Sequence, residues 1–414
     1  MADPHVLIIG GGIAGLLLAQ ALKREGIAFT VFERDPDAYC RGKGWGLTLH
    51  WVLDTFLSLL PRHLIDRIPE TLVDPVAAAR GENGRFPFFD LQTGETRWVV
   101  PPTKRLRMSR EKLRRLLMDG IDVQWSKELT DITESPDGVV AHLGKTTYTG
   151  SHLVGCDGGR SSTRRILCAA SGHDASSQPL PVRLLGASVA CPVSVGQRMQ
   201  QLDPYFFQGG DPKTSSFHFF SFLDTPANNN RDDSDTFDCQ IIVSWPYRVG
   251  FLGRAEATEV PAGNAERLKL MKEISRGWTS PFRDVIQGIP EDTQVQSIRL
   301  EDWVPEANAW SNMGGKATLM SDAAHAMTMY RGEAANHGIT DVRRWLDAHL
   351  EVLKAEKAGK EALATACSSY EQEMIGRTRV AVLASRQACL DAHDYSRISD
   401  SSPLVSRRAI VAVP

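Results

Sequence analysis

The segment from residue 6 to residue 33 constrains the fold of this chain more than any other. Its sequence is VLIIGGGIAGLLLAQALKREGIAFTVFE. A short apolar run at 6–9 ends in glycines, as a buried parallel strand does, and apolar positions at helical spacing follow over 13–25. The helical pattern stops at Gly26, and residues 28–33 are again rich in β-forming side chains. This order predicts a β-α-β unit with two parallel strands.

Gly10, Gly12 and Gly15 stand where the first strand meets the helix, with the spacing G-x-G-x-x-G. The first glycine permits a tight turn, the second lets backbone N–H groups approach a pyrophosphate, and the third allows close packing of helix on strand. Glu33 lies 18 residues after Gly15, where a carboxylate can bind adenosine ribose hydroxyls and disfavours a 2′-phosphate. The segment therefore predicts a site for FAD or NAD rather than NADP.

Length and composition limit the class of protein. The 414 residues exceed one ordinary core, so we expect two or three domains. A net charge of −3 gives no indication of nucleic acid as a partner. The seven cysteines lack C-x-x-C spacing, and no HExxH or cysteine–histidine cluster suggests a metal. We expect a cytoplasmic protein without a signal peptide or an integral membrane segment, because no apolar run approaches about 18–20 residues.

Two later segments complete the pattern: residues 153–164, LVGCDGGRSSTR, and residues 314–341, GGKATLMSDAAHAMTMYRGEAANHGITD. With three motifs in this order, the chain resembles the single-component, class A flavoprotein monooxygenases, the group typified by p-hydroxybenzoate hydroxylase. It is similar in particular to the fungal members that act in secondary metabolism. The resemblance covers nearly the whole chain. It implies FAD as the bound cofactor and NADPH or NADH as the co-substrate.

The resemblance also implies which residues of these two motifs contact the cofactors. The second motif would contact both FAD and the visiting nicotinamide through Asp157, Gly158, Ser161 and Arg164. In the third motif, Asp322 would bind the ribityl–pyrophosphate region of FAD. The stretch that contains Gly332, Ala335 and Asn336 would pass beneath the pyrimidine edge of the flavin, where a helix N-terminus stabilises negative charge.

Two further cofactor positions follow from the same resemblance. The glycine-rich segment RGKGWG at 41–46 would lie beside the flavin through Arg41, Gly44 and Gly46. Arg110, in MSREKLRRLL, matches a family arginine that opens a helix and reaches FAD. The alternative for Arg110 is a solvated basic helix face.

Three residues of the third motif depart from the family pattern. Ser321 stands where the family usually has glycine, Met329 where it has proline and Ala334 where it has glycine. A positive φ at Ala334 would cost on the order of 1 kcal/mol. The loss of the proline would cost at most about 1 kcal/mol. These amounts weaken a flavin site without abolishing it, and they motivate the alternative of a redox-silent descendant of the fold.

The fold class that follows is α/β, with a Rossmann-like FAD-binding domain, an inserted antiparallel β-sheet substrate domain and a C-terminal helical region. The middle of the chain alternates apolar and polar residues and is rich in aromatic side chains, as in SSFHFFSF and DCQIIVSW. We expect the FAD-binding domain at 1–75, 105–180 and 301–345, a hairpin at 76–104 that joins the substrate domain, the substrate sheet at 181–300 and C-terminal helices at 346–414.

Few residues of the substrate domain can be singled out. Arg183 stands where the chain enters that domain and is a candidate to polarise a substrate, with a salt-bridged surface arginine as the equal alternative. Trp45 and His50 are further pocket candidates. His325 belongs to the structural core of the third motif in the family, so we assign it no catalytic role.

The function implied is a monooxygenase that uses NAD(P)H and O2 through a C4a-hydroperoxyflavin. Its substrate would be an apolar, electron-rich aromatic, indolic, isoprenoid or polyketide metabolite, which it would hydroxylate or epoxidise. The alternative is a cyclase, isomerase or accessory protein of the same fold, with FAD structural or absent. An oxidase or a Baeyer–Villiger oxygenase also stays open, whereas a flavin halogenase is disfavoured because no W-x-W-x-I-P segment occurs.

Overall fold

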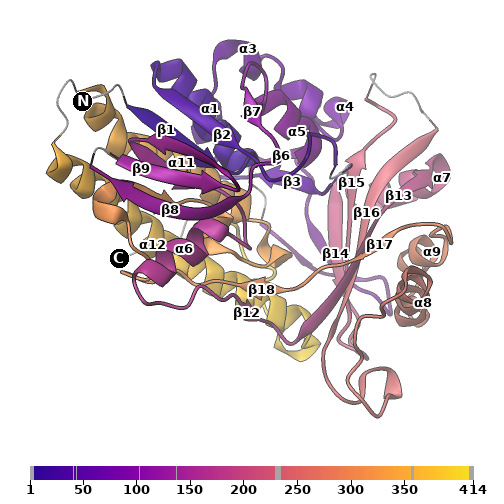
Figure 1. Cartoon of the computed structure of the whole chain (residues 1–414). Coiled ribbons are helices and arrows are strands. Elements are labelled where there is room, and N and C mark those ends of the chain that lie inside the picture. The colour runs from indigo at the N-terminus through magenta and orange to yellow at the C-terminus, as the bar shows by residue number, and fades with distance from the viewer. Residues whose placement is uncertain are drawn as a thin grey trace.

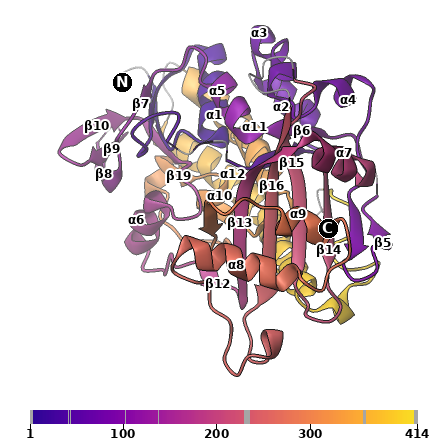
Figure 2. The same ribbon diagram turned by 90° about the vertical axis from the view of Figure 1, so that its right-hand side faces the viewer.

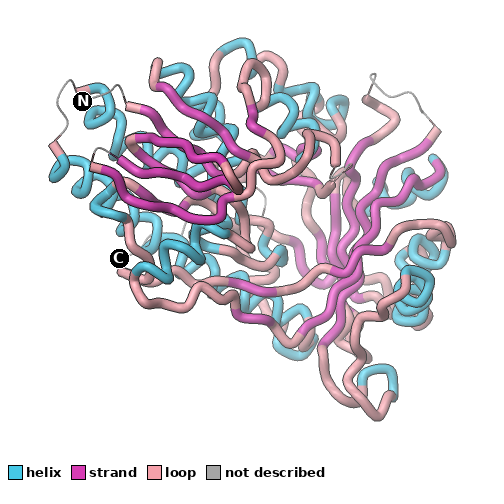
Figure 3. The backbone as a smooth tube through the Cα atoms, in the orientation of Figure 1, coloured by secondary structure: helices cyan, strands magenta, loops and turns pink. Residues whose placement is uncertain are grey.

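Two sheets, one parallel and one mainly antiparallel, organise the molecule (Figure 1). The computed structural model describes residues 4–40, 42, 44–101, 103–136, 138–228, 235–355 and 359–409. The backbone tube in Figure 3 shows the strands of the two sheets on opposite sides of the molecule, and most of the helices accompany the parallel sheet. No helix in these ranges is long and apolar enough to cross a membrane.

The parallel sheet contains the predicted β-α-β unit. Helix α1 (Ile13–Glu25) connects its two strands and ends at Gly26 in the left-handed conformation. All four strand pairs are parallel. The order across the sheet is β19 (Ala317–Leu319), β11 (His152–Gly155), β1 (His5–Ile9), β2 (Ala28–Phe32) and β7 (Val123–Gln124). The three sequence motifs therefore leave the carboxyl ends of neighbouring strands, the edge where ligands bind in open α/β sheets.

Helices enclose this parallel sheet and complete its core. Helix α1 packs against α5 (Arg110–Leu117) and α11 (Ala334–Lys354), and Leu16, Leu17 and Trp345 are fully buried there. The long helix α12 (Lys360–Ala392) follows α11 antiparallel to it. Shorter helices are α2 (Leu53–Leu59), α3 (Arg62–Ile65), α4 (Pro75–Ala79), α6 (Ser162–Ala170) and α10 (Asp322–His325).

The second sheet has seven strands. Their order is β17 (Val295–Ser297), β13 (Val182–Pro192), β16 (Thr236–Pro246), β15 (Phe217–Asp224), β14 (Phe206–Gly210), β4 (Pro87–Asp90) and β5 (Thr96–Val99). The β4–β5 hairpin extends the sheet from a distant part of the chain. Strands β4 and β14 pair in parallel, which makes the sheet mixed, whereas we expected a purely antiparallel one. Alternation of side chains along a strand does not specify the direction of its neighbour.

Three helices that the sequence analysis did not predict accompany this sheet: α7 (Val193–Leu202), α8 (Asn264–Ser275) and α9 (Phe282–Gln287). Figure 2 shows α8 and α9 in front of the strands, on the face away from the parallel sheet. Leu268 and Trp278 pack there against Phe207 and Trp245 of the strands. One face of the sheet is thus sealed by helices, and the other is turned toward the parallel sheet.

In the described ranges, three small sheets accompany the two large ones. The ribbon of β3 (Gly46–Leu49) and β6 (Leu106–Ser109) contacts β15 of the seven-stranded sheet. The remaining strands are β8 (Leu129–Ser135), β9 (Gly138–Leu143) and β10 (Thr146–Gly150) in a three-stranded sheet, and β12 (Gln178–Pro179) with β18 (Glu301–Asp302). The β3–β6 ribbon brings residues near both sheets and matters for the site.

Candidate active site

A cavity of about 760 Å³ lies between the carboxyl edge of the parallel sheet and the inner face of the seven-stranded sheet. Its volume is in the usual range for a small-molecule or cofactor site. The first and second sequence motifs line one part of it, and the third motif lines the middle. The remaining wall is aromatic and comes from the β3–β6 ribbon and the large sheet, and includes Trp45, Phe206, Phe217 and Phe219.

The glycine turn after β1 forms one end of the cavity. Gly10 has a φ of +111°, and a Cβ atom there would overlap the carbonyl oxygen of Cys156. A Cβ atom at Gly15 would overlap the carbonyl oxygen of Gly10. Gly12 is different, because a Cβ atom there would meet no atom within 4 Å. Gly10 and Gly15 therefore pack the turn, whereas Gly12 leaves open space in front of helix α1.

Glu33 is buried beside this turn. Its Oε2 accepts a hydrogen bond of 2.9 Å from the backbone N–H of Gly11, and its Oε1 accepts one of 3.1 Å from Asp35. Arg114 of α5 lies 3.6 Å from the same carboxylate and donates from Nε to the carbonyl oxygen of Gly11 at 2.8 Å. The sequence does not predict a role for Arg114, because it lies inside a run of basic residues that has the pattern of a solvated helix face.

The second motif connects directly to the third. Asp157 caps helix α6 by accepting from the backbone N–H groups of Ser162 and Thr163 at 2.8 and 3.0 Å. Arg164, almost completely buried, donates from Nη1 to the carbonyl oxygens of Asp322 and Ala323 at 3.4 and 3.2 Å. Arg164 therefore positions the loop that carries Asp322, and the two motifs form one structural unit.

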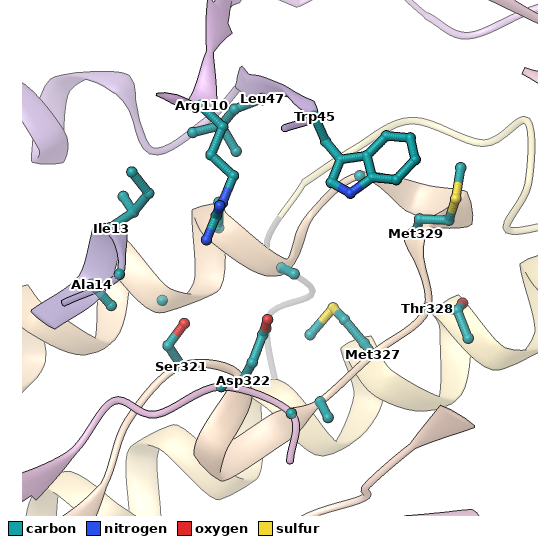
Figure 4. Close-up of a pocket in the computed structure, with 18 of the residues that line it drawn as sticks. Ile13, Ala14, Trp45, Leu47, Arg110, Ser321, Asp322, Met327, Thr328 and Met329 are labelled. Carbon is teal, nitrogen blue, oxygen red and sulfur yellow. The ribbon is translucent and has the colours of Figure 1, made fainter. Parts of the chain in front are cut away.

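Asp322 and Arg110 face one another across the middle of the cavity. Figure 4 shows the Arg110 side chain extending from α5 toward Ser321 and Asp322. Burial raises the pKa of the Asp322 carboxyl, and the charges of His325 and Arg110 oppose that rise. Arg110 thus lines the cavity, and the alternative of a solvated helix face does not describe it.

The structure places the backbone strain of the third motif at Ser321. Ser321 has φ 60° and ψ −142°, a conformation that glycine tolerates far better than serine. Ala334 is the first residue of helix α11 and has no positive φ, so the penalty considered above does not arise. The left-handed residue of this loop is instead Gly332, with φ +66°. Met329 lies in a 3-10 turn (Met329–Arg331) on the cavity wall.

His325 is part of a buried ion-pair network behind the cavity. Its Nε2 lies 2.6 Å from Asp341, and Asp341 accepts a second hydrogen bond of 2.7 Å from Arg377. The His325 and Arg377 side chains hold the pKa of the Asp341 carboxyl below its usual range despite burial. His325 does not line the cavity, and its contacts are those of a structural residue.

Several predicted cofactor residues lie away from the cavity surface. Asn336 does not line it, since its amide accepts from His50 N–H at 2.8 Å and donates to the Thr48 carbonyl at 3.0 Å. Gly44 is not among the lining residues, and Arg41 lies outside the described residues. By contrast, ten of the predicted cofactor positions line the cavity: Gly10, Gly12, Glu33, Gly46, Arg110, Asp157, Gly158, Asp322, Gly332 and Ala335.

The candidate role of Arg183 in polarising a substrate does not fit its position in the structure, which matches the salt-bridged alternative. The residue lies outside the cavity, where its guanidinium donates to both carboxylate oxygens of Glu259 at 2.6 and 2.9 Å and stacks 3.7 Å from the ring centre of Tyr247. The side chain is a salt-bridged arginine near the surface. Its place in the sequence, at the start of the seven-stranded sheet, does not show toward which face of β13 the side chain points.

The polar side chains of the aromatic half were missed by the sequence analysis. Thr48, Arg107, Gln208, Gln240 and Tyr330 all line the cavity there. A period-two signal could have indicated Arg107, because Arg105 and Arg107 alternate with Leu106 and Met108 as in a strand. Trp45 and His50, which the sequence analysis proposed as pocket residues, both line the cavity.

Comparison with known proteins identifies the family. A family model described as an FAD binding domain matches residues 3–194. A "Probable FAD-dependent monooxygenase" of Arthroderma benhamiae is 55% identical over 98% of this chain and 95% of that protein. The chain belongs to the FAD-dependent monooxygenases. A second relative of this family, dbaB of Emericella nidulans, is 41% identical over 81% of the chain and 84% of its own length.

Solved structures show the same fold for the whole monooxygenase. A salicylate hydroxylase in a substrate complex superimposes with a TM-score of 0.71, covering 97% of this chain and 91% of that one at 18% identity. The 2,6-dihydroxypyridine-3-hydroxylase from Arthrobacter nicotinovorans gives a TM-score of 0.74 at 15% identity and covers 100% and 98%. The predicted family and α/β fold class are confirmed, and the enzyme is an FAD-dependent oxidoreductase.

The described residues fit FAD. The open space at Gly12 lies at the N-terminus of α1, a helix long enough to offer oriented N–H groups to a pyrophosphate. The cavity continues from there past Asp322 and Arg110 to the N-terminus of α11. A dinucleotide can therefore extend along one continuous surface formed by the three motifs.

Proposed function

We propose that this monooxygenase uses NAD(P)H and O2 to hydroxylate or epoxidise an electron-rich metabolite. The substrate would be aromatic, indolic, isoprenoid or polyketide in origin, and the reaction would belong to secondary-metabolite biosynthesis. The observation that carries the proposal is that one cavity contacts both the three cofactor motifs and an aromatic wall. FAD, when bound, supplies the redox chemistry, while the protein positions the reactants and excludes water.

In this proposal each cofactor residue has a physical task. Glu33 binds the ribose of the adenosine, and the N-terminus of α1 at Gly12 faces the pyrophosphate. Asp322 and Arg110 hold the ribityl region between them. Gly332 and the N-terminus of α11 lie at the pyrimidine edge, where the helix dipole stabilises negative charge on the reduced ring.

The aromatic half of the cavity would hold the substrate. Phe206, Phe217 and Phe219 supply an apolar wall, and Trp45 and Met329, which lie near one another in Figure 4, line the same cavity. Such a pocket selects flat, apolar molecules and keeps water from the reacting atoms. The departures at Ser321, Met329 and Ala334 leave the cavity continuous, so they give no specific support to a redox-silent protein.

An absorbance spectrum of the purified protein from 300 to 550 nm tests the proposal first, followed by anaerobic addition of NADPH or NADH. We expect a flavin spectrum that bleaches with one of them, and O2 uptake that increases with candidate aromatic metabolites. The matched control is the Arg254→Gln variant, because Arg254 lies in an exposed ion pair with Glu273. A colourless protein that fails to take up added FAD, or O2 uptake that no candidate increases, would contradict the proposal.

A further inference from the structure

Arg107 is a buried arginine that reaches the substrate half of the cavity. It lies on β6, passes beneath Gly46 of β3 and ends between that ribbon and β15. Its Nη1 donates to Thr48 Oγ1 at 2.9 Å and its Nη2 to Ser221 Oγ at 2.7 Å, while its Nε has no partner. The residue is only 6% exposed. A Cβ atom at position 46 would overlap the guanidinium, so glycine there gives Arg107 its path.

No carboxylate lies within salt-bridge distance of Arg107 among the described residues. Its two hydrogen-bond partners are neutral hydroxyls. Burial lowers the pKa of Arg107 to about 9. A buried charge without a partner is costly, and removing an ion from water is ordinarily offset by an opposite charge. An anionic group bound in the cavity would therefore balance the charge of Arg107.

The surroundings add positive charge. His50 lines the same part of the cavity, and its pKa is lowered to about 3 by burial and by the charges of Arg105, Arg408, Arg107 and Arg331. Arg331 binds the carboxylate of Glu333 at 2.6 Å. Arg408 donates to backbone carbonyl oxygens, and the Nη1 and Nη2 atoms of Arg105 have no partner. Of these four guanidinium groups, only that of Arg331 has a carboxylate at salt-bridge distance among the described residues, although the charge of Asp203 also acts on Arg105.

The wall around Arg107 is apolar and flat. The guanidinium lies 5.1 Å from the ring centre of Phe206, and the Phe219 ring stacks on the Phe206 ring with 6.2 Å between their centres. Gln240, which also lines the cavity, accepts from Gly46 N–H at 3.1 Å and fixes the ribbon against the large sheet. The site thus combines one fixed positive charge with room for a planar ring.

We infer that the substrate is an aromatic or conjugated molecule that carries an anionic oxygen, a carboxylate or an ionised phenol or enol, and that Arg107 binds this oxygen. The inference rests on the proposed function, since it names the class of molecule that the same cavity accepts. The Arg107 guanidinium has five N–H donors at fixed angles, of which Thr48 and Ser221 accept two, and such a planar fork matches a delocalised oxygen anion better than a neutral carbonyl. Arg107 would set specificity and orientation.

Isothermal titration calorimetry with the FAD-loaded protein tests the inference without turnover. Two matched pairs serve as probes: 2,4-dihydroxybenzoate against its methyl ester, and 4-nitrophenol above its phenol pKa against its methyl ether. We expect the anionic member of at least one pair to bind about ten- to hundredfold more tightly than its neutral partner. Preference in the first pair assigns a carboxylate, and preference in the second an ionised phenol or enol.

Variants locate the effect. Arg107→Gln should remove the preference for the anion and leave the neutral probe unchanged, Arg107→Lys should retain part of the preference, and the surface variant Arg254→Gln should keep all of it. Equal affinity within both pairs, no binding of either anion, or a preference that survives Arg107→Gln would overturn the inference. The wild-type comparison decides even where Arg107→Gln does not fold. If the protein binds FAD and NADPH reduces the flavin, but the anionic probes bind no more tightly than the neutral ones, this inference is wrong while the proposed function stands.

Discussion

The hydroxyl group of Ser321 occupies the space that a side chain at position 338 would need. A Cβ atom built on Gly338 of helix α11 would overlap Ser321 Oγ, and Ser321 holds a backbone conformation suited to glycine. Its N–H also donates to Asp341 at 2.8 Å, which keeps the strained residue in place. The serine at this flavin-site position is therefore accommodated by a glycine on the facing helix.

This relationship predicts non-additive effects on stability. Gly338→Ala alone should lower the free energy of unfolding by about 1–3 kcal/mol, because it overpacks a filled site. With Ser321→Gly in the background, the same change should cost less by about 0.5–3 kcal/mol. Urea unfolding of the four proteins measures this double-mutant cycle. Additive free energies would show that the two residues do not compete for space.

Arg164 should be needed for the stability of the site. Arg164→Met leaves the buried carbonyl oxygens of Gly159 and Ala323 without a donor and removes a guanidinium that lies 4.9 Å from the Trp303 ring centre. We expect a loss of about 2–4 kcal/mol of unfolding free energy and weaker retention of FAD. The neighbouring Arg165→Met, on an exposed side chain, should stay within about 0.5 kcal/mol of wild type. Similar thermal shifts for both variants would argue against this role.

Glu33 should contribute to FAD affinity more than to folding. Glu33→Gln keeps the size of the side chain but replaces the carboxylate that accepts from Gly11 and Asp35. We expect FAD to bind about ten- to hundredfold more weakly, since hydrogen bonds to charged groups contribute about 1.5–3 kcal/mol. Flavin fluorescence quenching on titration of the apoprotein measures this. As a control, Glu25→Gln changes a partly exposed carboxylate at the end of α1 that pairs with Lys354. An equal loss in both variants would contradict a specific contact.

Buried neutral histidines should make the protein sensitive to acid. His218, His349 and His393 each donate from Nδ1 to a backbone carbonyl, and burial lowers the pKa of each to about 4. Because their unfolded pKa is about 6.5, the unfolded chain binds protons that the folded chain excludes. Stability is therefore complete above pH 6.5 and falls as the pH decreases toward 4.

The expected slope approaches about 1.4 kcal/mol per pH unit for each such histidine. Urea unfolding at a series of pH values measures the total slope. His349→Gln should reduce it by about one proton, whereas the exposed His63→Gln should leave it unchanged. A stability that is flat from pH 6.5 to 4 would show that these side chains already titrate in the folded protein.

Local patterns predicted the half of the site that is built from continuous segments. The turn at Gly10, the strand end at Glu33 and the loop at Asp322 each lie within a short motif, and parallel strands bring their carboxyl ends together. Arg110 and Arg183 show the limit of this reasoning. Both are arginines at the start of a regular element, yet one lines the cavity and the other pairs with Glu259.

The substrate half depends on contacts between segments that are distant in sequence. Arg107 meets Ser221, and β4 pairs with β14, because the β3–β6 ribbon and the β4–β5 hairpin fold onto a later sheet. Helix α8 was not predicted because its apolar residues do not form a clear stripe. No local pattern specifies these neighbours, and the domain boundaries given above stay a prediction.

Helix α12 spans the distance between the two walls of the cavity. About a third of the way along it, Tyr370 donates to the Leu319 carbonyl of the parallel sheet at 3.0 Å. Just beyond its end, His393 lies 2.9 Å from Ser244 of the seven-stranded sheet. Its 33 residues form a continuous rod of about 50 Å, and none of them lines the cavity. Because α12 and His393 are hydrogen-bonded to the two sheets, the helix fixes the distance between the two walls of the cavity. Substitutions in this helix, far from any substrate, can therefore alter which molecules fit.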